Sequence, residues 1–220
     1  MENPAKLHYA AAKHLASVYL AHTINEGIYY WRKHPLQTLP AGPLPVLHAD
    51  NHQITTDTTK IAQHLAGYTD SDWAADTKKR HSVTGIIIML AGGAIPYKSK
   101  FQDVIAPSST EAEFVAACDA AKIILFFRSI LDDLGIFQDD ATVLFEDNNG
   151  ALMMANTQQP TKGTRQIDIK HFSLLDWLLD WVQRDLIILE RITTHDNAAD
   201  AMTNPLSKNL FYRHFDTYMG

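Results

Sequence analysis

The order of strand-like and helix-like segments after residue 64 restricts the fold of this chain more than any other feature. Three strand patterns come first, then a long helical pattern that stops at Gly135, and from there the two types alternate. A meander followed by alternating units is typical of an α/β domain with a five-stranded mixed sheet and helices on both faces. The predicted strands are residues 65–73, 83–93, 94–102, 141–147 and 186–193, and the predicted helices are residues 109–134, 148–157, 170–185 and 196–206.

Residues 34–60 separate this pattern from the N-terminus. They contain four prolines and no hydrophobic periodicity, which indicates a linker or a long loop. Before them, residues 4–22 are predicted to form a helix and residues 26–33 a short strand. We therefore divide the chain into a helix-strand segment (1–33), a Pro-rich linker (34–64), one domain (65–207) and a C-terminal tail (208–220).

Composition limits the class of protein. Hydrophobic residues make up 46% of the 220 residues, which supplies a full core. No apolar run approaches the roughly 20 residues needed to span a bilayer, and the first residues lack the pattern of a secretory signal peptide. The single cysteine, Cys118, excludes an internal disulfide and a CxxC zinc site. We expect an intracellular protein with no membrane partner.

Two glutamates, Glu111 and Glu113, open the long helical segment. At 100° per residue, Glu113 falls on the apolar face, whereas Glu111 falls in the polar sector that faces solvent. Either one could complete a capping box, Glu113 with Thr110 or Glu111 with Ser108. If Glu111 is the capping residue, Glu113 is left as a buried carboxylate, which requires a partner or a metal.

Three aspartates occupy positions where open α/β sheets build their sites. Asp70 lies inside the first strand, with Asp72 on the same face; Asp147 ends a strand just before a helix; and Asp200 lies in the last helix. Each has an ordinary explanation: an edge-strand charge for Asp70, an N-cap for Asp147 and a helix-dipole partner for Asp200. Separate explanations of this kind account less well for these three aspartates and Glu113 taken together.

Four converging carboxylates repel one another unless cations lie between them. Hard divalent cations, most often Mg²⁺, prefer such oxygen ligands. Two ions about 3.5–4 Å apart can activate a water and stabilise the leaving oxygen in phosphodiester cleavage. The eleven histidines form no HExxH-like pair, which disfavours zinc. The acids therefore predict a site for two Mg²⁺ ions, with Mn²⁺ as an alternative.

Five segments, in order, carry a family resemblance: "GYTDSDWAADTKKRHSVTGIIIMLAGGAIPYKSKFQ", "SSTEAEFVAACDAAK", "LFEDNNGALMMAN", "RQIDIKHF" and "DNAADAMTNPL". They resemble the ribonuclease H domain of copia-type (Ty1/copia) retrotransposon polyproteins. Residues 4–31 resemble the segment that follows the reverse-transcriptase palm and fingers in the same polyproteins. Together these matches cover most of the chain.

The resemblance implies a ribonuclease H-like fold and hydrolysis of the RNA strand of RNA–DNA hybrids. Matched motif by motif, the catalytic and metal-binding acids are Asp70, Glu113, Asp147 and Asp200, with Asp72 as an alternative to Asp70. The implied partner is the remainder of a reverse transcriptase polyprotein, and the implied location is cytoplasmic, in a virus-like particle, or nuclear. His195, five residues before Asp200, is a weak match to the histidine that aids product release in many of these enzymes.

Basic and polar residues are predicted to bind the hybrid. Lysine and arginine contact phosphates without reading sequence, and amide side chains can hydrogen-bond a 2′-hydroxyl. The alternative is a set of solubilising loops, and the net charge of −6 argues against a general nucleic-acid-binding surface. The predicted contacts are Lys78, Lys79, Arg80, Lys100, Asn148, Asn149, Arg165, Lys170 and His171.

Three functions follow from these observations. The first is a Mg²⁺-dependent ribonuclease H of a retroelement. The second is a non-catalytic module of the same fold with a structural or interaction role in a reverse transcriptase. The third is a metal-dependent nuclease that acts on DNA.

Overall fold

The computed structural model of the chain describes residues 28, 64–76, 79–156 and 177–219. The predicted helix-strand segment and linker lie outside these residues, apart from Ile28 and His64, so the domain boundary stays a prediction. Among the described residues, no helix is long and apolar enough to cross a membrane.

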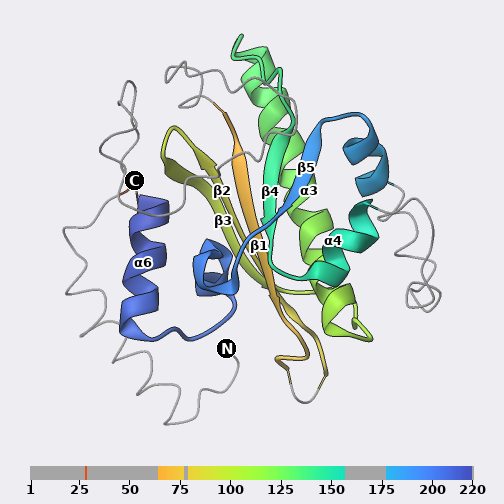
Figure 1. Cartoon of the computed structure of the whole chain (residues 1–220), viewed down its shortest axis with the longest axis vertical. Coiled ribbons are helices and arrows are strands. Elements are labelled where there is room, and N and C mark those ends of the chain that lie inside the picture. Colours follow the sequence, from red (N-terminus) through yellow and green to blue (C-terminus); the bar gives the residue numbers. More distant parts are fainter. Residues whose placement is uncertain (1–27, 29–63, 77–78, 157–176, 220) are drawn as a thin grey trace, which may run out of the picture.

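The described part of the chain is built on one five-stranded sheet in the order β3-β2-β1-β4-β5 (Figure 1). β1 pairs antiparallel with β2 and parallel with β4; β2 and β3 are antiparallel, and β4 and β5 are parallel. The predicted mixed sheet is therefore confirmed. The strands are β1 (Ala66–Asp72), β2 (Val83–Leu90), β3 (Gly93–Phe101), β4 (Thr142–Glu146) and β5 (Ile187–Arg191).

The β2–β3 hairpin turns earlier than the sequence pattern predicts. Leu90 pairs with Gly93, so Ala91 and Gly92 form a two-residue loop, and both have a positive φ, of 53° and 83°. Such a loop matches the twist of the flanking strands. Gly93 consequently begins β3 and does not end β2.

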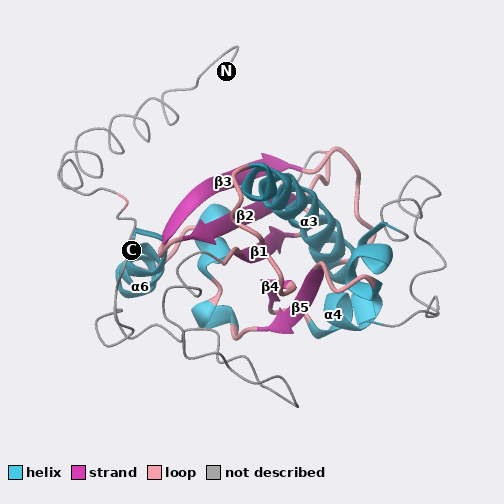
Figure 2. Ribbon diagram, turned by 90° about the horizontal axis from the view of Figure 1, so that it is seen from above, coloured by secondary structure: helices cyan, strands magenta, loops and turns pink. Residues whose placement is uncertain are grey.

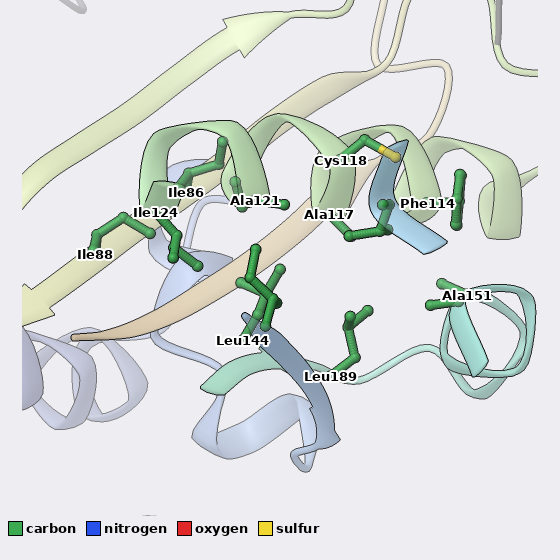
Figure 3. Packing of buried hydrophobic residues seen from close by; sticks show 14 of the residues in the cluster. Ile86, Ile88, Phe114, Ala117, Cys118, Ala121, Ile124, Leu144, Ala151 and Leu189 are labelled. Carbon is green, nitrogen blue, oxygen red and sulfur yellow. The ribbon is translucent and has the colours of Figure 1, made fainter. Parts of the chain in front are cut away.

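Helices α3 (Ser109–Asp133) and α4 (Asn149–Asn156) cover one face of the sheet (Figure 2). Fully buried alanines on α3, including Ala117 and Ala121, let the helix approach the sheet closely. They pack with Ile86, Ile88 and Leu144 from the central strands (Figure 3). This core fixes the helix that carries Glu113.

The opposite face of the sheet is covered by 3-10 helices η4 (Thr194–Asp196) and η5 (Ala198–Met202) and by helix α6 (Lys208–Met219). Residues 196–206 were expected to form one short helix. Instead Asn197 has extended geometry, with φ −73° and ψ 100°, which separates η4 from η5. The Asn197 side chain is fully buried and donates to the Thr69 carbonyl in β1 at 2.9 Å. It thereby attaches η5 to the sheet.

The expected C-terminal tail is mostly helical. Residues 208–219 form α6, which packs against η5 and β3. His214 on α6 is 1% exposed, so a buried residue anchors this helix against the elements it contacts. Of the predicted helix 170–185, only residues 177–183 are both described and helical.

Candidate metal centre

Three of the four predicted acids converge at one edge of the sheet. Asp70 lies in β1, Glu113 in the N-terminal part of α3 and Asp147 directly after β4, and each offers a carboxylate oxygen within 4.8 Å of the others. β1 and β4 are neighbouring parallel strands, so their carboxyl ends meet at this edge. Asp72, the alternative to Asp70, lies outside this group of three.

The structure separates the roles of the two glutamates of α3. The Glu111 amide donates to the Ser108 hydroxyl at 3.3 Å, and the Glu111 carboxylate accepts hydrogen bonds from Ser108 in return. Glu111 is therefore the capping-box residue. Glu113 is buried beside Asp70 and Asp147, and its Oε2 has no hydrogen-bond partner among the described residues.

The expectation that Glu111 faces solvent is wrong, because the residue is only 7% exposed. Residues 111–118 are all buried. The N-terminal part of α3 is thus covered on every side, whereas a helical-wheel argument assumes that one face is open to water.

Asp147 does not cap the helix that follows it. The cap is Asn148, whose Oδ1 accepts from the backbone amides of Gly150 and Ala151 at 2.9 and 3.1 Å. The ordinary explanation for Asp147 is thereby removed, and its carboxylate remains available to the acid cluster.

Asp200 lies beside the cluster but outside it. It is buried in η5, and its Oδ1 accepts a hydrogen bond from Asn204 Nδ2 at 2.7 Å. Its charge, with those of Asp147 and Asp72, helps to raise the pKa of Asp70. The four acids therefore interact, although only three place their oxygens together.

Burial dominates the electrostatics of this site. It raises the pKa of Asp70 to about 6, with smaller contributions from neighbouring carboxylates and an opposing hydrogen bond from Thr203. It raises the pKa of Glu113 to about 10, with the charges of Glu146, Asp70 and Asp147 adding to the effect. Without a cation, the cluster therefore holds protons near neutral pH.

Glu146 is a fifth acid at this site that the sequence reasoning missed. It ends β4 on the side of α3, is fully buried, and accepts from the Asn148 amide through Oε1 at 2.9 Å. Its Oε2 has no hydrogen-bond partner in the described part of the chain, and burial raises its pKa to about 8. Alternation along the strand places Glu146 and Asp147 on opposite faces of the sheet, but a strand covered on both faces gives no sequence signal that marks Glu146.

The predicted hybrid-binding residues are only partly described. Lys79 and Arg80 are exposed in the β1–β2 loop, at the same end of the sheet as the acid cluster. Lys100 is exposed and pairs with Asp103 at 3.2 Å, Asn148 caps α4, and Asn149 accepts from Arg191. His195 is exposed in η4. Lys78, Arg165, Lys170 and His171 lie outside the described residues.

No protein-family model matches the chain. It is 33% identical over 147 residues to the retrovirus-related Pol polyprotein from transposon TNT 1-94 of Nicotiana tabacum, a match that covers 67% of the chain and 11% of that polyprotein. It is 30% identical over 212 residues to the corresponding polyprotein from transposon RE1 of Arabidopsis thaliana, covering 96% of the chain and 12% of the relative. A solved structure, that of LC11-RNase H1 isolated from compost, shares 16% identity and a TM-score of 0.47 over 64% of this chain and 94% of that one.

The chain thus spans about a tenth of the length of these relatives. The similarity to these two plant polyproteins confirms the resemblance carried by the five sequence segments. This chain is homologous to the copia-type Pol polyproteins of plant transposons.

Proposed function

We propose that this chain is the ribonuclease H part of a retroelement polyprotein and hydrolyses the RNA strand of RNA–DNA hybrids with divalent cations. The observation that carries the proposal is the convergence of Asp70, Glu113 and Asp147 within 4.8 Å. Two buried acids, Asp70 and Glu113, beside a half-buried Asp147 at the carboxyl edge of an α/β sheet are costly to the fold unless they serve a ligand.

The donor set fits Mg²⁺, or Mn²⁺ in its place. The donors are all carboxylate oxygens, and Glu113 Oε2 is buried with no hydrogen-bond partner from the residues that the structure describes. Asp70, Glu113 and Asp147 would hold the cation, with Asp200 as the neighbouring fourth acid. A bound pair of such ions supplies an activated water and stabilises the charge on the leaving oxygen.

The rest of the site would orient the substrate. Lys79 and Arg80 extend from the loop at the same end of the sheet, where they could hold backbone phosphates of the hybrid. Asn149 is exposed two residues after Asp147 and could donate its amide hydrogens to a sugar hydroxyl. The remainder of the polyprotein is the expected partner, because the relatives are much longer than this chain.

The proposal is tested with the Asp147→Asn variant in a cleavage assay on an RNA–DNA hybrid with Mg²⁺. Asn keeps the size of the side chain but removes the charge that a cation requires, so cleavage should be lost. Without metal the variant should be at least as stable as the parent, because one repelling charge is gone. Mg²⁺ should raise the melting temperature of the parent more than that of the variant.

Asp103→Asn is the matched control, since Asp103 is exposed and pairs only with Lys100 among the described residues. It should cleave like the parent. Near-parental cleavage by Asp147→Asn would remove Asp147 from the site. A parent that binds Mg²⁺ but cleaves neither hybrid nor duplex DNA would instead favour the non-catalytic module.

A further inference from the structure

The segment that carries Asp200 rests directly on the backbone of β2. Gly85 of β2 pairs with Asp70 of β1. A Cβ atom at Gly85 would lie 2.7 Å from Thr203 Cγ2, 2.8 Å from the Ala199 carbonyl oxygen and 2.9 Å from Met202 Cβ. The absent side chain is therefore what lets η5 and Thr203 approach the sheet beside Asp70.

Thr203 makes two different contacts at this point. Its methyl group lies over Gly85, and its hydroxyl donates a hydrogen bond to Asp70 Oδ2. Its backbone amide donates to the Asp200 carbonyl at 3.2 Å. Thr203 thus connects β1, which carries Asp70, to η5, which carries Asp200.

Asn204 extends this connection to the Asp200 side chain. Its Nδ2 donates to Asp200 Oδ1 at 2.7 Å and contacts Thr203 Oγ1 at 3.1 Å. An amide nitrogen has two hydrogens, so it can serve both acceptors while the Thr203 hydroxyl donates its own hydrogen to Asp70. Asp70 and Asp200 are therefore held by one hydrogen-bond chain that runs through Thr203 and Asn204.

Further contacts keep this chain in place. Ser99 in β3 donates to the Met202 carbonyl at 2.6 Å, and Asn197 donates to Thr69 in β1. η5 and the residues that flank it are thus attached to three strands, to β1 and β3 through side-chain hydrogen bonds and to β2 through the close contact on Gly85. A donor that is already fixed in this way loses less conformational entropy when it binds a carboxylate than a donor on an unattached loop does.

We propose that Thr203 and Asn204 are positioning residues that hold Asp70 and Asp200 as ligands for a divalent cation. The inference rests on the proposed function, since it assigns these residues to the same metal site. Hydrogen bonds of this kind fix the orientation of ligating carboxylates, and their loss typically weakens metal affinity by about 10–100-fold.

The test is the affinity of the full chain for Mn²⁺, measured by titration calorimetry without nucleic acid. Thr203→Val keeps the branched shape and loses the hydroxyl, whereas Thr203→Ser keeps the hydroxyl and loses the methyl group. We expect Thr203→Val to bind Mn²⁺ roughly 10–100-fold more weakly and Thr203→Ser to stay near the parent. Methyl packing on Gly85 alone predicts the reverse order, and that order would overturn the proposal.

Two further variants supply a control and a second test of the proposal. Thr193→Val removes a similar hydroxyl, one that donates to Asp196 at 2.7 Å in η4, and should leave the affinity unchanged. Asn204→Ala should weaken binding as Thr203→Val does, and because Asn204 is exposed this variant tests the proposal even if Thr203→Val fails to fold. Parental affinity in Asn204→Ala would overturn the inference and leave the proposed function standing. A parent that binds no Mn²⁺ would overturn both.

Discussion

Single acidic residues at the cluster are buried, and burial favours their protonated form more than water does. Asp70, Glu113 and Glu146 are all buried, and burial is the largest cause of the raised pKa of each. In each case the folded protein binds protons more tightly than the unfolded chain does. Metal-free stability must therefore depend on pH.

Glu146→Gln should reduce this dependence. The pKa of Glu146 rises from 4.5 to about 8 on folding, so its neutral form is favoured in the native state. The parent consequently loses stability as pH rises through the window from about 4.5 to 8. Gln has no charge to bury, so the variant should lose less, by an amount of the order of 1–3 kcal/mol.

The measurement is thermal unfolding in EDTA at pH 5.5 and pH 8.5. Asp139→Asn, which removes one charge from an exposed residue, is the control and should follow the parent. An equal loss of stability in the parent and in Glu146→Gln would show that Glu146 is already ionised in the native state.

At this scale the sequence identified Glu113 but not Glu146. Glu113 could be chosen because it interrupts an apolar helix face, and Ala117, Ala120 and Ile124 on that face are all buried. Glu146 could not, because in a strand covered on both faces neither alternating position is marked as polar. The burial of Glu111 was missed because a helical wheel assumes that one face is open to water, whereas residues 111–118 are all buried.

At the scale of elements, the sheet and helix α3 were predictable because their patterns are long and regular. The turn between η4 and η5 was not, since it depends on the buried hydrogen bond from Asn197 to Thr69, 128 residues apart in sequence. Helix α6 was missed because a segment of twelve residues has little helical stability alone and depends on packing against η5 and β3. The missed elements are therefore those defined by long-range contacts.

Gly85→Ala tests whether the close approach of η5 to the sheet serves the metal site. The added Cβ would meet the Ala199 carbonyl oxygen at 2.8 Å, and backbone cannot rotate away as a side chain can. We expect η5 to move outward, with a loss of about 1–3 kcal/mol in stability. The rise in melting temperature produced by Mg²⁺ should shrink as well.

Gly67→Ala is the matched control on the opposite face of the sheet. There the added Cβ would meet the ends of Ile88, Leu144 and Ile124 at 3.0–3.1 Å, in the core between the sheet and α3. This variant should also lose stability but keep the full response to Mg²⁺. An equal Mg²⁺ response in both glycine variants would mean that η5 does not contribute to the site.

For the whole molecule, charge is the main difficulty for binding a nucleic acid. The chain carries a net charge of −6, and the acid cluster adds negative charge at the site where the proposed function requires phosphates to bind. Attraction must therefore come from local basic residues. Arg80 lies at the end of the sheet that holds the cluster, whereas Arg184 precedes β5 and lies at the opposite end.

Arg80→Gln and Arg184→Gln compare these two ends with the same change of charge. If Arg80 contacts a phosphate, its loss should weaken hybrid binding and reduce the log–log dependence of affinity on salt by about 0.7–0.9. Arg184 is 63% exposed and pairs with Asp180, so its loss lowers the net charge equally but should leave that slope unchanged. The measurement is the binding of a short labelled hybrid across a range of salt in EDTA, which prevents cleavage. Equal slopes in the two variants would show that binding responds to total charge, and Arg80 would then be a residue of a solvated turn.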